Sequence, residues 1–452
     1  MKKRVSGAGL AVRCWSGRKP DKQAMSIRQL LLSGCLLGLG AVACTGSAQA
    51  QPTPLSPLGG TLTLPAVLEA ARQNPDVLAA RRAMEAARAD VRAADRAPAP
   101  VLSAGVSSID LRNGNGTGSF WTQKRLDKSL GMDWTWERGN KRGLRTEAAE
   151  RAAQAASADS QEMRVQQQIG ALAAFYDLLA AQERLQALLA LADSARTLAN
   201  TADLRLKAGD VSAQDAARTR IEAERSEAEL QSARLGLHQA MQALAAWTGH
   251  HVPATGWRAE GAWPQSGHST GAIDIDALIE QRPDVTAARE RLAAADAALQ
   301  GALALNRADP TLGATFDHYP TGEKTDRLLA VRISIPINGF SRFEGEIGRA
   351  LAQKDLAQDL LEKTRIQARA DMLSLQQAWQ AQSSRLQTYE TRILPQAQQV
   401  ASQAELAYSK GGLSLTDLLD ARRTLRATQL ETTGVRNDHA RALGAWQLRT
   451  TP

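Results

Sequence analysis

The stretch that decides the fold is Lys410–Leu425, KGGLSLTDLLDARRTL, because a version of it occurs twice. About two hundred residues earlier, Lys207–Glu222 reads KAGDVSAQDAARTRIE. Each copy carries a glycine, a serine and an acid at the same spacing: Gly209, Ser212 and Asp215, then Gly411, Ser414 and Asp417. A glycine that ends one helix, with a serine shortly after it that begins the next, is typical of a helical hairpin turn. The sequence therefore predicts two helical hairpins with these stretches as their tips.

Other landmarks recur in the same order, which indicates a tandem duplication. They are NPDVLAAR from Asn74 and RPDVTAAR from Arg282, PVLSA from Pro100 and PTLGA from Pro310, the Gly139–Arg142 and Gly339–Arg342 spacings, and ALAAW from Ala243 and ALGAW from Ala442. We divide the chain into a leader (1–50), a first repeat (51–250), a linker (251–270) and a second repeat (271–452).

The leader has the order of an export signal. Arg28 precedes the apolar run Leu30–Val42, and Ala48-Gln49-Ala50 is a small-x-small cleavage site. Translation starting at Met25 would keep all of these features. Lipid modification of Cys44 is an alternative to cleavage after Ala50.

Charge and cysteine content argue against nucleic-acid binding and against thiol chemistry. The formal net charge is +8, but the leader holds eight basic residues and one acid, which leaves 47 basic and 46 acidic residues. This balance gives no support for a nucleic-acid partner. Cys14, Cys35 and Cys44 all lie in the leader, so the mature chain has no cysteine for disulfides or thiolate chemistry.

Hydrophobic periodicity predicts helices and four strands. Each repeat begins with a helix-forming stretch, Leu64–Arg96 or Ile273–Asn306, and then alternates apolar and polar residues with period two. We expect strands near 101–111, 127–137, 310–319 and 327–337. Long helices follow over about 144–207 and 344–410, with a kink or break at Pro395. In the first of these, an apolar seam of period 3.5 is formed by Val165, Ile169, Leu172, Tyr176 and Leu179.

Four strands cannot close a membrane barrel, whose practical minimum is about eight. Hydrocarbon cannot satisfy the open edges of a four-stranded sheet, but three chains would supply twelve strands. A sandwich of short strands outside the membrane is the alternative, and the aromatic content of 4% favours it. Phe120, Trp121, Trp134 and Trp136 nevertheless lie on or beside the strands, as in an interfacial belt.

The duplicated order resembles the TolC family of outer-membrane efflux channels over nearly all of residues 60–450. Tyr408–Ala421 resembles the second-hairpin motif of that family, and Ser334–Gly339 its strand-to-helix exit. The resemblance implies a mainly α fold with a membrane β-barrel part. It implies a homotrimer whose four strands per chain form a shared twelve-stranded barrel above long antiparallel helical hairpins. Glu137–Arg142, ERGNKR, resembles a stretch common in the heavy-metal, CzcC-like branch, although related branches carry it too.

The same resemblance assigns roles to residues near the tips. Asp417 and Asp420 correspond to a charged constriction, and as acids three residues apart they share one helix face. Ordinary helix-start acids are the alternative. Asp215 and Tyr408 correspond to a latch of the closed state, or Tyr408 packs as a core aromatic. Leu413 stands where the best-known members have a basic residue, which leaves the ion-pair part of the latch in doubt. The expected docking tips for the adaptor comprise Gly209, Ser212, Gly411, Gly412 and Ser414.

Catalytic and metal motifs are missing from the sequence. The pair His250-His251 has no carboxylate or thiol at a spacing that would complete a tetrahedral site, and we read both as solvated helix-end residues. No nucleophile elbow, phosphate loop or zinc-protease motif occurs. We expect no enzyme activity, no cofactor and no resident metal.

The leading hypothesis is a passive outer-membrane exit duct with a large periplasmic part. Its expected partners are a periplasmic adaptor, an inner-membrane pump of the RND type and outer-membrane lipid. A periplasmic coiled-coil adaptor and an exported scaffold are the competing hypotheses. Adaptors have one hairpin, whereas this chain has two. Metal cations fit the acid pair as cargo, and drugs or other small molecules fit the fold equally well.

Overall fold

A computed structural model describes residues 60–451 apart from 122, 266–273, 322–323 and 338–341. The leader, with Met25, Cys44 and the cleavage site, lies outside the described residues. So do part of the 251–270 linker and Gly339 of the strand-to-helix exit.

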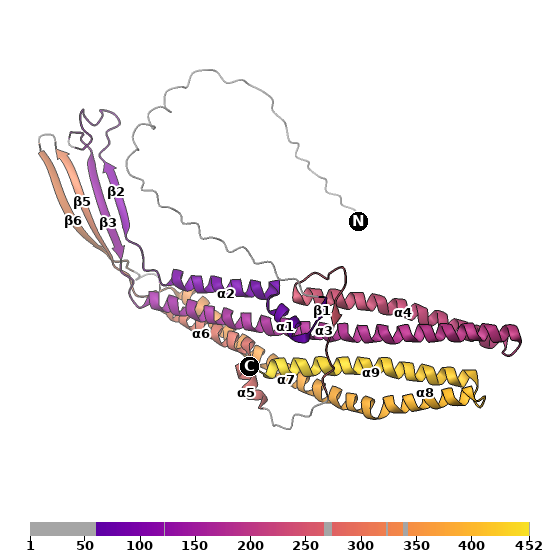
Figure 1. The fold of residues 1–452 in the computed structure, drawn as a ribbon. Helices are drawn as coiled ribbons and strands as arrows, with labels where there is room; N and C mark the ends of the chain where they lie inside the picture. The colour runs from indigo at the N-terminus through magenta and orange to yellow at the C-terminus, as the bar shows by residue number, and fades with distance from the viewer. Residues whose placement is uncertain (1–59, 122, 266–273, 322–323, 338–341, 452) are drawn as a thin grey trace, which may run out of the picture. The chain divides into compact units, whose positions relative to one another are not determined.

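The element order repeats, as the duplication predicts (Figure 1). Each half contains two helices, two long strands and a long helical hairpin. The first half comprises α1 (Leu64–Arg72), α2 (Pro75–Ala94), β2 (Val101–Ser107), β3 (Asp127–Thr135), α3 (Lys141–Ala208) and α4 (Ala213–Thr248). The second comprises α5 (Ile275–Gln281), α6 (Pro283–Ala304), β5 (Thr311–Thr321), β6 (Lys324–Ser334), α7 (Glu344–Thr388), η1 (Tyr389–Ile393), α8 (Leu394–Ser409) and α9 (Leu415–Thr450).

Each helix-forming stretch that opens a repeat is two helices, so the prediction of single stretches was wrong. The breaks come before Pro75 and Pro283, because a residue that precedes proline is disfavoured in the helical region. At the first break, the buried Asn74 caps α2 and donates to the carbonyls of Ala246 and Trp247 at 3.0 and 2.9 Å. The break therefore fastens the start of α2 to the end of α4.

A five-residue π-helix, η1, interrupts the second hairpin just before Pro395. Proline has no backbone N–H and its ring crowds the preceding turn, which favours wider local winding. The expected kink or break at Pro395 thus takes the form of a π segment between α7 and α8.

The long helix α3 runs without interruption for 68 residues, roughly 100 Å. Its seam residues Leu172, Tyr176 and Leu179 are buried in the main core of the first repeat. The linker contributes to this core, which the sequence did not predict. Its residues Arg258–Ala259 form β4, which pairs in parallel with β1 (Thr61–Leu62), and the neighbouring Trp257 is buried.

The four long strands form one antiparallel sheet in the order β2-β3-β5-β6, so β2 and β6 are its edge strands. The structure confirms four strands in the expected places, with different ends: β2 and β3 stop earlier, and β6 starts three residues earlier. In the register, Leu102 lies opposite Met132, which pairs with Ala314, which pairs with Val331.

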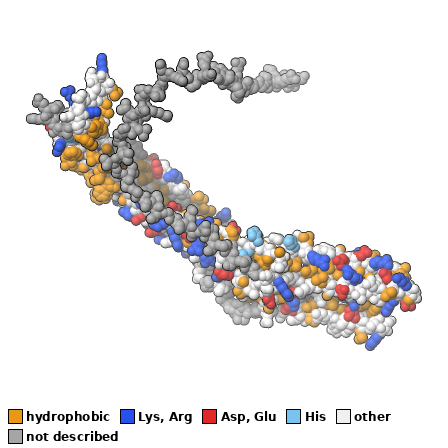
Figure 2. Space-filling model, turned by 45° about the horizontal axis from the view of Figure 1, so that its top comes forward, with side chains coloured by type: hydrophobic (Ala, Val, Ile, Leu, Met, Phe, Trp, Pro, Cys, Tyr) orange, Lys and Arg blue, Asp and Glu red, His pale blue; other side chains and the backbone are white. Residues whose placement is uncertain are grey.

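The two faces of the sheet differ sharply. One face exposes large apolar side chains, and Figure 2 shows apolar side chains gathered over the sheet. They include Leu102, Leu130, Met132, Trp134, Phe316, Leu329, Val331 and Ile333. The other face carries mostly small and polar residues, with Val101 and Leu328 as exposed apolar exceptions. An ion pair of 2.8 Å from Arg332 to Asp133 crosses this face beside Gly313.

Among the described residues, no helix combines the length and the apolar character needed to cross a bilayer.

Two helical glycines offer a matched test of the packing between α3 and α4. A Cβ added at Gly170 would lie 2.5 Å from the Trp247 ring, whereas one at Gly236 would meet no heavy atom within 4 Å. Both alanine variants gain helix propensity, so the difference between them isolates the clash. We expect Gly170→Ala to be less stable than Gly236→Ala by about 1–3 kcal/mol. Thermal unfolding followed by circular dichroism measures this difference, and equal midpoints would contradict the packing.

Candidate functional site at the hairpin tips

The first tip joins α3 to α4 through a left-handed glycine. Gly209 has φ of 84°, and the N–H groups of Gly209 and Asp210 donate to the carbonyls of Leu206 and Arg205 at 3.1 and 2.8 Å. These bonds satisfy the last carbonyls of α3. Ser212 then begins α4: its hydroxyl accepts from the Asp215 N–H at 3.1 Å and donates to the Asp215 carboxylate at 2.8 Å. The glycine and the serine therefore act as the repeated motif predicts.

The second tip has the same construction between α8 and α9. Gly411 has φ of 74°, and the Gly412 N–H donates to the Ala407 carbonyl at 2.9 Å. The Ser414 hydroxyl accepts from the Asp417 N–H at 3.2 Å and donates to its carboxylate at 2.7 Å. No heavy atom lies within 4 Å of a Cβ built at Gly209 or Gly411, so both tips are open to a partner.

Asp417 and Asp420 are both exposed on the first turns of α9. Asp417 takes part in the cap of its helix, as expected of an acid in the first turn. Asp420 does not cap the helix; its carboxylate lies 3.5 Å from the Arg423 guanidinium. The two acids thus differ in their surroundings although they share one helix face.

Asp215 and Tyr408 come from different hairpins and line the same small cavity, with Val211 and Leu415. No hydrogen bond joins the two side chains in the part of the chain that the structure describes. Arg218 lies beside them: its guanidinium donates to the Thr416 hydroxyl at 3.2 Å and lies 4.0 Å from the Asp215 carboxylate. Arg218 therefore places a basic group beside Asp215, whereas Leu413 is apolar.

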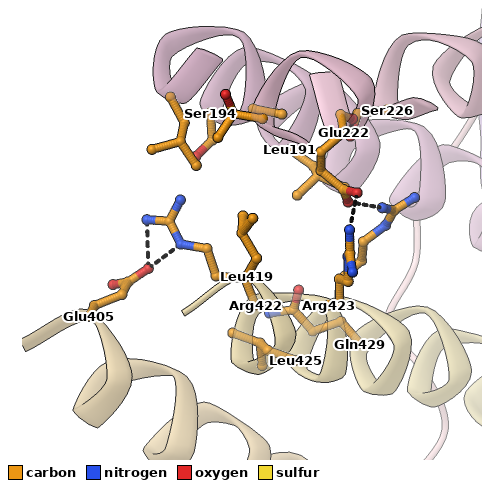
Figure 3. A pocket seen from close by; sticks show the side chains of 14 residues that line it. Leu191, Ser194, Glu222, Ser226, Glu405, Leu419, Arg422, Arg423, Leu425 and Gln429 are labelled. Carbon is orange, nitrogen blue, oxygen red and sulfur yellow. Dashed lines mark hydrogen bonds and ion pairs between the residues drawn. The ribbon is translucent and has the colours of Figure 1, made fainter. Parts of the chain in front are cut away.

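A larger cavity lies between the two hairpins, lined by α3, α4, α8 and α9 (Figure 3). Glu222 of α4 points into it and meets two guanidinium groups of α9, Arg423 at 2.7 Å and Arg426 at 3.7 Å. Arg426 also contacts Glu229, and Arg422 pairs with Glu405 of α8 at 2.9 Å. We call Glu222, Arg423 and Arg426 the inter-hairpin cluster.

The side chains of Glu222 and Arg426 are largely shielded from solvent, whereas that of Arg423 is about half exposed. The hydrogen bond to Glu222 raises the pKa of Arg423, whereas burial lowers the pKa of Arg426. Both guanidinium groups stay charged at neutral pH, since arginine is not deprotonated in proteins. The cluster therefore holds the α4 and α9 helices of one chain together close to the tips.

No set of three or more His, Cys, Asp or Glu side chains that could hold a metal ion occurs within the described ranges. His250 contacts the Thr248 carbonyl at 2.8 Å, at the end of α4. The fully buried His439 has a pKa lowered by burial and is therefore neutral at pH 7.

The sequence pattern that defines the family described as "Outer membrane efflux protein" matches residues 66–250 and 275–446. These two segments coincide closely with the two repeats.

Known proteins resemble the chain in sequence and in fold. It is 28% identical over 387 residues to the cobalt-zinc-cadmium resistance protein CzcC of Cupriavidus metallidurans, which covers 83% of this chain and 87% of the relative. Crystal structures of CusC match with a TM-score of 0.72 and 18% identity, over 85% of this chain and 91% of that one. The outer membrane protein VceC of Vibrio cholerae matches with a TM-score of 0.68 and 22% identity, over 85% and 95%.

The family pattern covers both repeats, and the overall fold agrees with the structural matches over 85% of this chain. The chain therefore belongs to the outer membrane efflux protein family and is an outer-membrane protein with a large periplasmic helical part.

Proposed function

We propose that the chain is the passive exit duct of a tripartite efflux system that exports metal cations. An inner-membrane pump of the RND type supplies the cargo, and a periplasmic adaptor joins the pump to the tips. The observation that carries this proposal is the pair of matching open tips, reached from the sheet by one continuous helix of 68 residues. In this proposal one end of the molecule contacts lipid and the other end contacts a protein partner.

In this proposal three copies share one barrel. The exposed apolar face of the sheet contacts lipid, and the face with the Asp133–Arg332 ion pair lines the lumen. The edge strands β2 and β6 pair with the edges of neighbouring copies, because hydrocarbon offers no partner to free backbone groups. Three copies of four strands make a closed barrel of twelve.

The gate in this proposal lies at the narrow end of the duct. Asp417 and Asp420 form a ring of up to six carboxylates in the trimer, which attracts cations and repels anions. Asp215, Tyr408 and Arg218 hold the closed state near the tips, together with the inter-hairpin cluster.

Metal cations are the proposed cargo for two reasons. The relative CzcC is named for cobalt, zinc and cadmium resistance. An acidic constriction also favours cations over anions and neutral solutes. Organic drugs are the competing cargo, and drug sensitivity is therefore measured beside metal resistance.

The tips are tested by changing both glycines, Gly209→Val and Gly411→Val. A β-branched residue is strained at positive φ, so the turns should distort and export should fail, although a Cβ at either position would meet no heavy atom within 4 Å. We expect zinc, cobalt and cadmium resistance to fall to the level of a strain lacking the chain, with unchanged amounts in the outer membrane.

The matched control is Gly209→Asn with Gly411→Asn, since asparagine tolerates the left-handed region. This variant should keep resistance. Unchanged resistance in the valine variant would refute docking at the tips. If the valine variant changed sensitivity only to organic drugs, metal cations would be refuted as the cargo, but the role as an exit duct would still hold.

The gate is tested by the double change Asp417→Asn and Asp420→Asn. Asparagine keeps the shape and the cap while removing up to six charges from the trimer, and focusing of the field in a narrow mouth makes those charges count strongly. Channels in planar bilayers should lose their cation preference and their block by multivalent cations from the periplasmic side.

Asp355→Asn with Asp359→Asn is the control, because both acids are exposed on α7, far along the chain from the tips. It should leave selectivity unchanged. Wild-type selectivity and block in the Asp417/Asp420 variant would show that these aspartates only begin a helix.

A further inference from the structure

A row of basic residues crosses the sheet near the end remote from the helices. In the register, Lys128 of β3 pairs with His318 of β5, which pairs with Arg327 of β6. The row lies on the apolar face, because each member is two residues along its strand from a member of the next row, Leu130, Phe316 and Leu329. The apolar band thus ends in positive charge at this rim.

Acids are segregated to the opposite face. Side chains alternate along a strand, so the acids in the described parts of β3, β5 and β6 share the face of Gly131 and Thr315. They are Asp127, Asp133, Asp317 and Asp326. The face that would meet lipid therefore carries basic side chains and no acid in these strands.

Lys128 is a buried cation without an anion. It is 9% exposed, its ammonium lies 5.1 Å from the Phe120 ring centroid, and it donates to the Leu126 carbonyl at 3.3 Å. No carboxylate of the described residues lies within ion-pair distance of it. An ammonium has three donors, and a charge removed from water is stable when it is paired. The Lys128 ammonium therefore has no counter-ion among the described residues.

The loop between β2 and β3 covers this end of the apolar face. Phe120 and Trp121 meet edge to face at 5.2 Å, and the His318 Nε2–H donates to the Trp121 carbonyl at 2.9 Å. Trp121 remains exposed, as does Arg327. Aromatic rings beside cations at the border of an apolar band are typical of the level of lipid headgroups.

We propose that Lys128 and Arg327 bind a diphosphorylated lipid headgroup of the outer leaflet. Two strand spacings separate them, roughly 10 Å, which suits two phosphates on one headgroup. The acyl chains would lie along the row of Leu130, Phe316 and Leu329. The outer leaflet follows from the topology, since the helices lie in the periplasm and the row is at the other end of the strands. The inference rests on the proposed membrane position of the sheet.

The experiment titrates the purified full-length protein in detergent with diphosphoryl lipid A, with phosphatidylcholine and with inorganic phosphate. Native mass spectrometry counts the lipids bound. Lys128→Gln and Arg327→Gln should each weaken lipid A binding about fivefold. Arg332→Gln is the matched control, because it removes a cation from the same strand as Arg327 but from the opposite face.

Wild-type protein that binds lipid A no tighter than phosphatidylcholine would overturn the proposal. Equal affinities of Arg327→Gln and Arg332→Gln would do so too, whether or not Lys128→Gln folds. Displacement of lipid A by millimolar inorganic phosphate would identify a site for free phosphate and overturn the lipid assignment. Cell fractionation before the titration separates the membrane position of the sheet from lipid binding by Lys128 and Arg327. Failure of the wild type to enter the outer membrane would refute the position of the sheet, whereas the titration tests lipid binding.

Discussion

The rest of the structure depends on the backbone hydrogen bonds at the edges of one small sheet. In the hydrocarbon core an unpaired N–H or C=O cannot form a hydrogen bond with water. Each such group lowers the stability of the inserted protein by several kcal/mol. This chain places four strands in one sheet and leaves β2 and β6 as its edges. A lone copy would therefore be unstable in a bilayer, whereas three copies would pair every edge. In the closed barrel the apolar face would then contact lipid, and the face with the Asp133–Arg332 ion pair would line the lumen.

The duplication allows the wall to continue into the helices. Each pair of strands leads into a helical hairpin, and each hairpin ends in the same turn, a left-handed glycine followed by a serine cap. The repeats are alike at the tips but differ in between. The first hairpin has an unbroken α3, whereas the second contains the π segment before Pro395. The inter-hairpin cluster of Glu222, Arg423 and Arg426 joins the two hairpins near the tips, where movement would open or close a duct.

Much of this architecture could be predicted from the sequence, because it rests on local patterns. Period two and period 3.5 located the strands and the long helices, and the repeated Gly-x-x-Ser located both tips. Features that depend on distant partners gave no such signal. The pairing of β1 with β4 involves only two residues on each side, and Glu222 lies about two hundred residues from Arg423. The helix breaks before Pro75 and Pro283 could have been predicted, because a residue before proline is disfavoured in the helical region. They were missed because the sequence has helical periodicity on both sides of each proline. The hydrogen bond from Arg218 to Thr416 was not predicted, because it depends on the fold that brings α4 beside α9.

Closure of the sheet between copies is the central claim, and disulfide trapping tests it most directly. The leader holds all three native cysteines, so engineered pairs report without interference once the leader is removed. Ser103→Cys on β2 is combined in turn with Leu328→Cys, Ala330→Cys and Arg332→Cys on β6, which share its face of the sheet. Our account predicts that at least one pair gives a covalent trimer in outer membranes, and that each single-cysteine variant stays uncrosslinked. Crosslinks confined to single chains, or their absence from every pair in inserted protein, would contradict a shared barrel.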